Sequence, residues 1–303
     1  MNSVKQYNSD FQKRRVIGVF AHNEEKNIVQ CLESLKICVR KDDICVVLNN
    51  GSKDNTASVV ECFMKENDFC RIFTTEIGDK ANAWNFFIHE LKIDADIFYF
   101  LDGDCQISRN ALDNLEVCLS ENIFANAAAA LPSVKVSPKF RAEMIKNGGL
   151  AGNLYALSKR FVENLRLNNV YLPVGFIGDD SLVGALAYWD LNTQGEWVKE
   201  KIITCSSADF CYTRLSLFSL ADIRFYYRRK FRYSLRYIQI ELIKPILKQE
   251  GLKAIPNTVD DMYKNKISEL RIKWRGVDTF FDYLAVSYIK KCVNKLTKKG
   301  KGL

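Results

Sequence analysis

The sequence predicts an α/β fold, with a Rossmann-like, mostly parallel sheet flanked by helices and a helical, basic C-terminal extension. Two patterns carry this prediction. Short apolar runs alternate with segments of helical spacing over the first hundred residues, and positive charge gathers near the C-terminus. Strands separated by helices of this length belong to parallel sheets that are covered on both faces. We place a domain boundary between residues 1–222 and 223–303, because the chain suffices for a domain of about 200 residues and an elaborated C-terminal part.

Four apolar runs in the first hundred residues are expected to be strands. They cover residues 16–20, 44–48 and 71–75 and the run that ends at Asp102. The segments between them place apolar residues at the spacing of a buried helix face. These residues are Ile28, Cys31, Leu32 and Leu35, then Val59, Val60, Phe63 and Met64, then Trp84, Phe87, Ile88 and Leu91.

Composition indicates a globular protein and excludes a largely disordered chain, since 48% of the residues are hydrophobic and 26% are charged. No apolar run reaches the ~18 residues of a membrane span, and no apolar stretch follows the N-terminal charges as it would in a signal peptide. We therefore expect a cytoplasmic protein. The ten cysteines form no C-x-x-C pair, and most are expected to be small buried hydrophobes. This expectation covers Cys31, Cys38, Cys45, Cys62 and Cys118.

The chain has only two histidines, His22 and His89. They are too few for a His-rich zinc site or a Ser-His-Asp triad, so any catalysis is expected to rest on carboxylates. Charge is uneven: residues 224–248 contribute +7 and residues 290–301 contribute +6 to a net charge of +8, which leaves −5 elsewhere. This asymmetry favours contact with an anionic surface or substrate.

A pair of acids follows the fourth expected strand, in the sequence IFYFLDGDC from Ile97 to Cys105. Asp102 and Asp104, two residues apart, can turn toward one hard cation, and Gly103 allows close approach of the backbone. The pair is typical of Mg²⁺ or Mn²⁺ bound between protein carboxylates and a diphosphate. The alternative is an ordinary Asp-Gly-Asp turn.

Polar residues also follow the other three expected strands, and ligands of parallel sheets bind beyond the carboxyl ends of the strands. One pocket is expected to collect His22-Asn23-Glu24, Asn49-Asn50-Gly51-Ser52, Gly78-Asp79-Lys80 and the acid pair. Helix capping is an alternative role for Asn27, Asp54 and Thr56. Lys80 is either a solvated surface residue or a phosphate ligand; a cation at a helix start opposes the helix dipole, which favours the second role.

Six segments in order resemble those of the family 2 inverting glycosyltransferases with a GT-A fold. FAHNEEKNI, VVLNNGSKDNT, IGDKANAWN and FLDGDC resemble the nucleotide-binding segments of that family. GGLAGNLYALSKRFV resembles its acceptor-side segment, and IGDDSLVGAL (177–186) resembles its catalytic-base segment. The resemblance covers roughly residues 14–190.

The resemblance implies roles for individual residues. Asp102 and Asp104 match the D-x-D of the family, which implies ribose and metal contacts, with Asp104 the better candidate for the Mn²⁺ or Mg²⁺ ligand. Asp180 matches the general base, and Asp179 is its neighbour. Residues implied to contact the nucleotide sugar are Ala21, Asn23, Glu24, Asn50, Gly51, Ser52, Lys80, Asp102 and Gly103.

The chain departs from the pattern of the family at Asn49 and Asn50, where two aspartates are usual. An asparagine carbonyl still accepts from the N3–H of uracil, but its amide also donates, so bases other than uracil are not excluded. UDP remains the expected nucleotide.

The implied reaction suits the residues. A divalent cation stabilises the departing diphosphate, a carboxylate takes the proton of the attacking hydroxyl, and a single displacement inverts the anomeric centre. The alternative role of Asp179 and Asp180 is to cap the helix that begins at SLVGALAYW.

Residues 228–237 are basic and aromatic, and two interpretations stay open. They dock on an anionic membrane at its inner face and reach a lipid-linked acceptor, or they form a partly buried helix whose arginines cover the diphosphate. In either case Arg228 or Arg229 is expected to reach the donor. A processive synthase is not expected, because the Q-x-x-R-W signature is missing. Residues 257–281 give no functional indication, and the lysine-rich tail is expected to be disordered.

Two other functions compete with glycosyl transfer. A sugar-1-phosphate nucleotidyltransferase would show a glycine-rich loop after the first strand, and AHNEEKN contains no glycine. A non-catalytic relic that binds nucleotide sugars is indicated only by the NNGS substitution. The expected partners are therefore a nucleotide-sugar donor and a glycan or lipid-linked acceptor, with an anionic membrane surface as a further candidate and no nucleic acid.

Overall fold

The computed structural model describes residues 15–213 and 220–299 of the chain, which forms two compact units. Unit 1 contains residues up to 170 and from 179 to 213, and unit 2 contains residues 171–178 and the C-terminal part. The short segment 171–178 therefore belongs with the C-terminal helices, although the residues on either side of it belong to unit 1.

Unit 1 is built on one sheet whose strand order is β3-β2-β1-β4-β7-β6-β8-β5 among the described residues. Only β5 and β7 run opposite to the other six strands, so the predicted mostly parallel sheet is confirmed. The strands are β1 Arg15–Ala21, β2 Ile44–Asn50, β3 Cys70–Thr75, β4 Ile97–Asp102, β5 Cys105–Ile107, β6 Ala127–Pro132, β7 Leu154–Ser158 and β8 Ile202–Tyr212.

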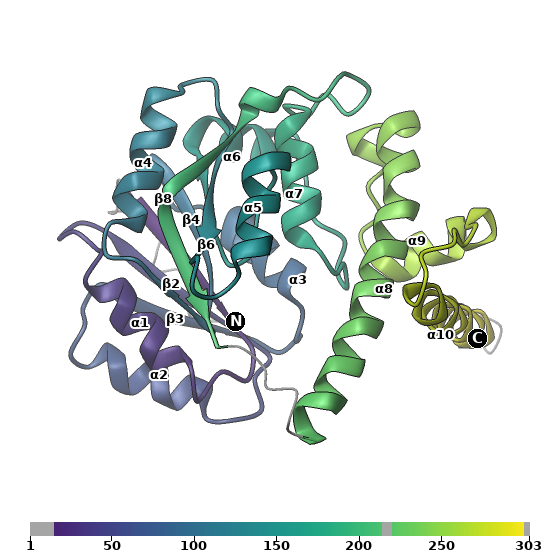
Figure 1. Ribbon diagram of the computed structural model, residues 1–303, viewed down its shortest axis with the longest axis horizontal. Coiled ribbons are helices and arrows are strands. Elements are labelled where there is room, and N and C mark those ends of the chain that lie inside the picture. The colour runs from purple at the N-terminus through teal and green to yellow at the C-terminus, as the bar shows by residue number, and fades with distance from the viewer. Residues whose placement is uncertain (1–14, 214–219, 300–303) are drawn as a thin grey trace. The chain divides into compact units, whose positions relative to one another are not determined.

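Helices pack along this sheet, as Figure 1 shows, with α1 and α2 next to each other. They are α1 Ile28–Lys36, α2 Thr56–Met64, α3 Lys80–Asn85, the π-helical turn η2 Phe86–Glu90, α4 Ala111–Glu121, α5 Pro138–Asn147, α6 Lys159–Leu167, α7 Asp179–Tyr188 and the short η3 Lys199–Lys201.

The predicted helix faces are confirmed most fully in α1, whose buried residues are the four expected ones. In α2, Val60 and Phe63 are buried and Thr56 completes the face, whereas Val59 and Met64 are only half-buried. The third predicted helix is α-helical only to Asn85 and continues as η2.

An aromatic layer lies beneath the carboxyl end of β4. Phe100 stacks on Tyr155 with ring centroids 4.6 Å apart and on Trp84 at 5.9 Å. Trp84 Nε1 donates to the Tyr155 hydroxyl at 3.1 Å. A side chain at Gly18 would meet the Phe87 ring at 3.0 Å, so this glycine lets η2 pack directly on β1. The end of β4 therefore packs on a fully buried layer of aromatic side chains.

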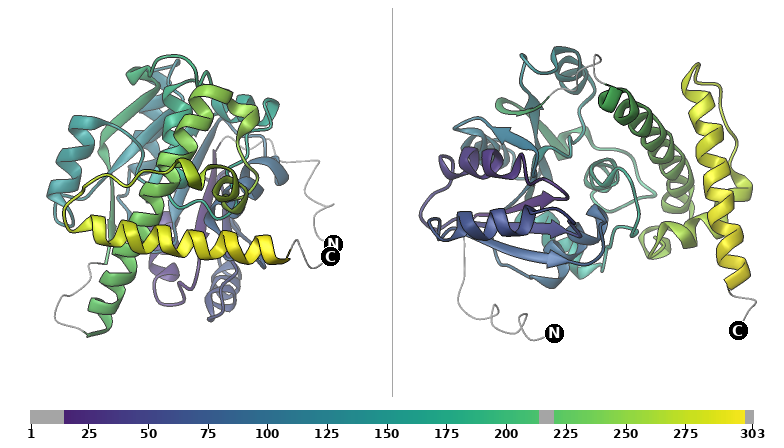
Figure 2. Two further views of the ribbon diagram at one scale, coloured as in Figure 1. Left: turned by 90° about the vertical axis from the view of Figure 1, so that its right-hand side faces the viewer. Right: turned by 90° about the horizontal axis from the view of Figure 1, so that it is seen from below.

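Unit 2 consists of the segment 171–178 and five helical segments. Its centre is the buried Gln239 of α8, which accepts from Ile177 N at 2.6 Å and donates to Gly175 O and to the Tyr263 hydroxyl. Figure 2 shows the long helix α10 crossing α8. The helical segments are α8 Leu220–Glu250, η4 Leu252–Ala254, α9 Val259–Lys266, η5 Ile267–Glu269 and α10 Asp278–Lys299.

These elements test three expectations, on the C-terminal extension, the lysine-rich tail and the cysteines. The helical C-terminal extension is confirmed, but the expected disorder of the lysine-rich tail is wrong up to Lys299, where α10 ends; residues 300–303 lie outside the described part. Cys31, Cys38 and Cys45 are buried as expected, whereas Cys62 is exposed and Cys118 is half-buried. Within the described ranges, no helix is long and apolar enough to cross a membrane.

Candidate active site

The strand register brings the predicted site residues of unit 1 to one edge of the sheet. Phe20 of β1 lies opposite Asp102 of β4, and Ala21 lies opposite Asn49 of β2. Asn50 in turn pairs with Thr75, the last residue of β3. Because these strands are parallel and end at the same level, the loops that follow them meet.

The loops after β1 and β2 are joined through Asn23 and Ser52. Asn23 adopts φ of 57°, in the left-handed region that asparagine tolerates better than most residues. Its backbone N donates to Ser52 Oγ at 2.9 Å, and its Oδ1 accepts from Lys53 N at 2.8 Å. Glu24 N donates to Thr56 Oγ1 at 2.8 Å. The first two predicted nucleotide-binding segments thus form one ordered surface.

His22, which the sequence places in the pocket without an individual role, connects this surface to the loop after β3. Its Nδ1 donates to the Asn50 carbonyl at 2.6 Å, which leaves Nε2 to accept from Asn23 Nδ2 at 2.9 Å. The Asn50 side chain continues the network, since its Oδ1 accepts from Asp79 N at 2.7 Å. The side-chain carbonyl of Asn50, the residue expected to contact the base, therefore already accepts a hydrogen bond within the protein.

Gly51 is required by the contact between these loops. Its φ is +59°, and a Cβ there would lie 2.6 Å from Gly78 N. Gly78 in turn packs on the His22 ring, 3.1 Å from where its Cβ would lie. No side chain fits at Gly51 without movement of the backbone.

Lys80 lies at the centre of the site. It is the first residue of α3, whose start is capped by Asp79 Oδ1 accepting from Asn82 N at 2.7 Å. Its Nζ lies 2.6 Å from Asp102 Oδ1 and 3.4 Å from Asp179 Oδ2. The solvated-surface interpretation is therefore wrong, because one ammonium bridges the D-x-D segment and the predicted base segment.

Burial acts on both charges of this bridge. It lowers the pKa of Lys80, but Asp102 and Asp179 outweigh it and raise that pKa well above its ordinary value. Burial raises the pKa of Asp102 to about 7. Lys80 opposes this rise, whereas Asp104 and Asp179 add to it. The pKa of Glu24 is also raised, mainly by burial, with a contribution from Asp104. Carboxylates here repel one another.

Asp104 is exposed, in the turn between β4 and β5. The turn is held against β1 because Gly103 N donates to Phe20 O at 2.9 Å. A Cβ at Gly103 would meet Phe20 O and the Ala21 side chain at 3.1 Å. In this structure Gly103 and Ala21 thus serve the packing that holds Asp104 outward.

The donor set suits a divalent cation that completes its coordination with a ligand. Among the described residues, no three His, Cys, Asp or Glu side chains are grouped closely enough to hold a metal ion by themselves. Mg²⁺ and Mn²⁺ sites that use one or two carboxylates, with phosphate and water oxygens for the rest, need no such group. Exposed Asp104 and the raised pKa of Asp102 fit a site of this kind.

Asp179 and Asp180 form the first turn of α7, and both are buried. Asp180 Oδ2 accepts from Gly152 N at 3.2 Å, and Oδ1 accepts from Ser181 N at 2.8 Å. Asp179 Oδ2 is buried without a hydrogen bond and has only its ion-pair contact with Lys80. The capping alternative is met in part by the bond to Ser181, but the contacts to Gly152 and Lys80 reach outside the helix.

The structure adds residues 152–155 to the site, although the sequence predicts no individual role for them. Gly152 O accepts from Lys80 Nζ at 3.4 Å, and Asn153 O accepts from Asp102 N at 3.1 Å. Tyr155 lies beneath, in the aromatic layer. The signal for them was present, because they belong to the segment that resembles the acceptor side of the family.

Arg228 and Arg229 lie on α8 in unit 2, and both are exposed. Arg229 stacks over the Tyr233 ring at 5.3 Å, and its Nε donates to the Tyr233 hydroxyl at 2.6 Å. Their predicted contact with the donor stays a prediction.

The profile of "Glycosyl transferase family 2" matches residues 16–168, half of the chain. The chain belongs to this family and is a glycosyltransferase, as the sequence predicted. No curated protein matches it significantly.

Solved structures support the GT-A fold. The mannosyltransferase PcManGT from Pyrobaculum calidifontis, in complex with GDP-Man and Mn²⁺, is similar with a TM-score of 0.59 at 16% identity, over 96% of this chain and 92% of that one. TarS 1–349 from S. aureus, in complex with UDP-GlcNAc, gives 0.51 at 13% identity, over 94% and 92%. GalNAc-T7 with UDP, GalNAc and Mn²⁺ gives 0.51 at 13% identity, over 84% and 57%.

Proposed function

We propose that this glycosyltransferase moves a sugar from a nucleoside diphosphate sugar, with UDP the expected nucleotide, to a hydroxyl of a glycan or lipid-linked acceptor. The reaction is a single displacement that inverts the anomeric centre and uses Mn²⁺ or Mg²⁺. The observation that carries the proposal is the Lys80 bridge, which brings Asp102 of the donor segment and Asp179 of the base segment to one ammonium.

The bridge suggests a separate role for each charged residue of the site. The ammonium group of Lys80 is fixed by its ion pairs beside the acids of the donor segment, where a diphosphate would otherwise meet only negative charge. Asp180, oriented by two backbone N–H groups, accepts the proton of the attacking hydroxyl. Asp104 and Asp102 would hold the divalent cation, which, when bound, stabilises the charge that develops on the departing diphosphate.

The nucleotide is the part of the proposal that rests on Asn50. Its Oδ1 is engaged by Asp79 N, so its amide hydrogens are the groups left to face a base. The O4 of uracil accepts such a hydrogen. Because similar folds are solved with GDP-Man and with UDP-GlcNAc, the fold alone does not select the base.

A donor screen tests the proposal. Nucleotide sugars are incubated with Mn²⁺, and release of free nucleoside diphosphate is measured with and without EDTA. We expect slow, EDTA-sensitive hydrolysis of one or a few UDP-sugars. The anomeric configuration of the transferred sugar, followed by NMR once an acceptor is found, should be inverted. Binding of a nucleotide sugar without any turnover would favour the non-catalytic alternative.

Asp104→Asn tests the metal ligand within the same screen. The variant should keep its fold, because Asp104 is exposed, and lose the Mn²⁺-dependent part of UDP affinity in calorimetry. Its matched control is Asp94→Asn, which removes another exposed carboxylate from unit 1. Metal-dependent affinity that is unchanged in the Asp104 variant would remove this residue from the site.

A further inference from the structure

Unit 2 exposes a group of large apolar and aromatic side chains around the start of α10. Trp274 is 85% exposed, Val277 80%, Phe280 59% and Tyr283 62%. We call these four residues the aromatic surface. Single exposed apolar side chains are ordinary, but four within ten residues form a patch of the kind that marks an interaction site.

The chain holds these side chains outward by anchoring the residues between them. The guanidinium of Arg275 lies 3.8 Å from the centroid of the Tyr237 ring and 3.0 Å from Asp282 Oδ1. Its backbone N donates to Thr279 Oγ1 at 2.7 Å. Asp282 and Thr279 are buried. With Arg275 turned inward, its neighbours Trp274 and Val277 are displayed on an ordered loop.

Helix α10 continues the same exposed face. Its described side chains include a buried stripe and an exposed stripe; Tyr288 is also exposed but lies outside both, with its ring packed against Phe231. The buried stripe is Thr279, Asp282, Ala285, Val286 and Ile289. The exposed stripe is Phe280, Tyr283, Ser287, Lys290, Lys291 and Asn294, with the helical spacing of one face. Aromatic rings therefore occupy the N-terminal part of this face and lysines the C-terminal part.

The charge around the aromatic surface is positive. Between residues 270 and 294 the only acids are Asp278 and Asp282, and both are in ion pairs, with Lys230 and Arg275 respectively. Cations of the same stretch lie in water: Arg271, Lys290 and Lys291 are exposed, and Lys273 is exposed but pairs with Glu241 at 2.8 Å.

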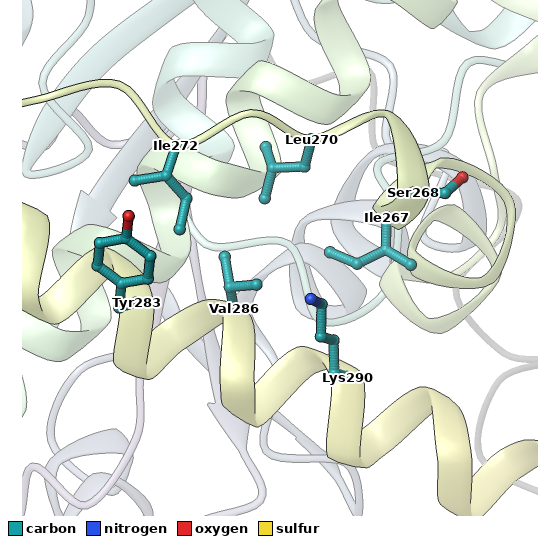
Figure 3. Close-up of a pocket in the computed structure, with 7 residues that line it drawn as sticks. All are labelled: Ile267, Ser268, Leu270, Ile272, Tyr283, Val286 and Lys290. Carbon is teal, nitrogen blue, oxygen red and sulfur yellow. The ribbon is translucent and has the colours of Figure 1, made fainter.

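An open pocket of about 520 Å³ adjoins this face. Figure 3 shows Ile272 and Leu270 on one side of it and Val286 on the other, with Tyr283 and Lys290 of the exposed stripe among its lining residues. The lining thus combines four aliphatic side chains with the hydroxyls of Ser268 and Tyr283 and the ammonium group of Lys290. A ligand that joins a hydrocarbon chain to an anionic group would be complementary to this lining.

We propose that unit 2 docks on an anionic lipid bilayer through the aromatic surface, with Lys290 and Lys291 at the headgroups and an acyl chain in the adjoining pocket. Trp and Tyr combine an apolar body with a polar group, which suits the boundary between lipid and water, and flanking lysines gain from the negative surface potential. A second copy of this chain, packed stripe against stripe, would need acidic groups opposite these cations, and the exposed stripe offers none.

This surface differs from the docking segment expected at residues 228–237. Two cations of that segment are engaged within unit 2, Arg229 with Tyr233 and Lys230 with Asp278. The aromatic surface begins 37 residues further along the chain, in the segment whose sequence pattern gave no functional indication. The inference does not depend on the proposed donor chemistry.

Sedimentation with vesicles tests the surface. Vesicles of phosphatidylcholine alone are compared with vesicles that contain about one third phosphatidylglycerol. We expect binding only to the second kind, weakened at least about tenfold by Trp274→Ser with Phe280→Ser, and several-fold by Lys290→Gln with Lys291→Gln. Binding should also weaken as salt rises from about 50 to about 300 mM. Phe124→Ser and Lys41→Gln are the matched controls, since both residues are exposed in unit 1.

Tryptophan fluorescence reports directly on Trp274. Trp84 and Trp189 are buried, and Trp197 is 54% exposed. In a Trp197→Phe background, Trp274 is thus the exposed indole, and its emission should shift to the blue on anionic vesicles and be quenched by brominated lipid. Circular dichroism and thermal unfolding establish that the variants fold.

Three outcomes would overturn the proposal. They are equal binding to neutral vesicles, vesicle binding unaffected by the aromatic and lysine variants, and a concentration-dependent dimer that Trp274→Ser abolishes in light scattering. The last would assign the aromatic surface to a second copy of the chain. Donor hydrolysis without vesicles is unaffected in each case, so the result is separate from that of the donor screen.

Discussion

Lys80 makes the two acidic segments of the site interdependent. Replacing it by methionine keeps the aliphatic stem but leaves Asp102 and Asp179 without the cation that lies 2.6 Å and 3.4 Å from them. We expect donor hydrolysis to fall by a factor of about 10² or more, because a preorganised cation beside the diphosphate is lost. Steady-state kinetics measure it, with Lys65→Met as the control for an exposed lysine of unit 1. Near-normal kinetics in Lys80→Met would contradict this role.

A substitution of Asp180 distinguishes a role in donor binding from a role in the transfer reaction. Asp180→Asn should keep the affinity for the nucleotide sugar and lower transfer by a factor of about 10² or more, as loss of a positioned proton acceptor does. Calorimetry gives the affinity, and single-turnover kinetics give the rate. Asp179→Asn is the informative comparison, because Asp179 faces Lys80 and should affect donor affinity as well as rate. An equal loss of affinity and rate in both variants would assign the two acids to binding.

At the scale of elements, the loop contact at Gly51 offers a test with an internal control. Gly51→Ala adds a Cβ 2.6 Å from Gly78 N at φ of +59°. Gly251→Ala adds a Cβ at φ of +80° with no atom within 4 Å. Both variants carry backbone strain, but only the first carries a clash, so we expect Gly51→Ala to lose more stability, by about 1–3 kcal/mol in urea unfolding. Equal losses of stability in the two variants would mean that the loops after β2 and β3 can move apart to make room for the added Cβ.

Strands and helix faces were predictable because their signal is local and repeated. The periodicity of Ile28, Cys31, Leu32 and Leu35 appears unchanged as the buried face of α1. The end of β4 at Asp102 was predictable for the same reason, since an apolar run stops there.

What escaped prediction depends on contacts between distant backbone groups. His22 donates to a main-chain carbonyl 28 residues away, and no side-chain pattern encodes that bond. Arg15 follows a charged stretch and would be expected in water, yet it opens β1 fully buried with Asp43, Asp113 and Glu116 around it. These partners of Arg15 come from two separate segments, the loop before β2 and helix α4, and only the folded unit brings them together.

At the scale of the whole molecule, stability should depend on pH through His89. Its ring is buried, and Nε2 donates to Val170 O at 2.9 Å. Burial lowers the pKa of His89, so the folded protein holds it neutral. The unfolded chain binds the proton near pH 6.5. The contribution to stability is therefore present above about pH 6.5 and is lost as the pH falls toward the folded value, by at most about 1.4 kcal/mol per pH unit.

Urea unfolding between about pH 5.5 and 7.5 measures this dependence. His89→Gln keeps a donor for Val170 and cannot titrate, so its stability should vary less with pH than that of the parent chain. Parallel stability curves for the two proteins would show that groups other than His89 account for the pH dependence.

The bond from Asp102 N to Asn153 O has a consequence for insertions in the chain. The fifty residues from Gly103 to Gly152 start at the end of β4, contribute β5 and β6 to the far part of the sheet, and return to the end of β4. The two ends of this segment are fixed to each other, so we expect an insertion within residues 133–150, around α5, to leave Asp102 and Asn153 in place.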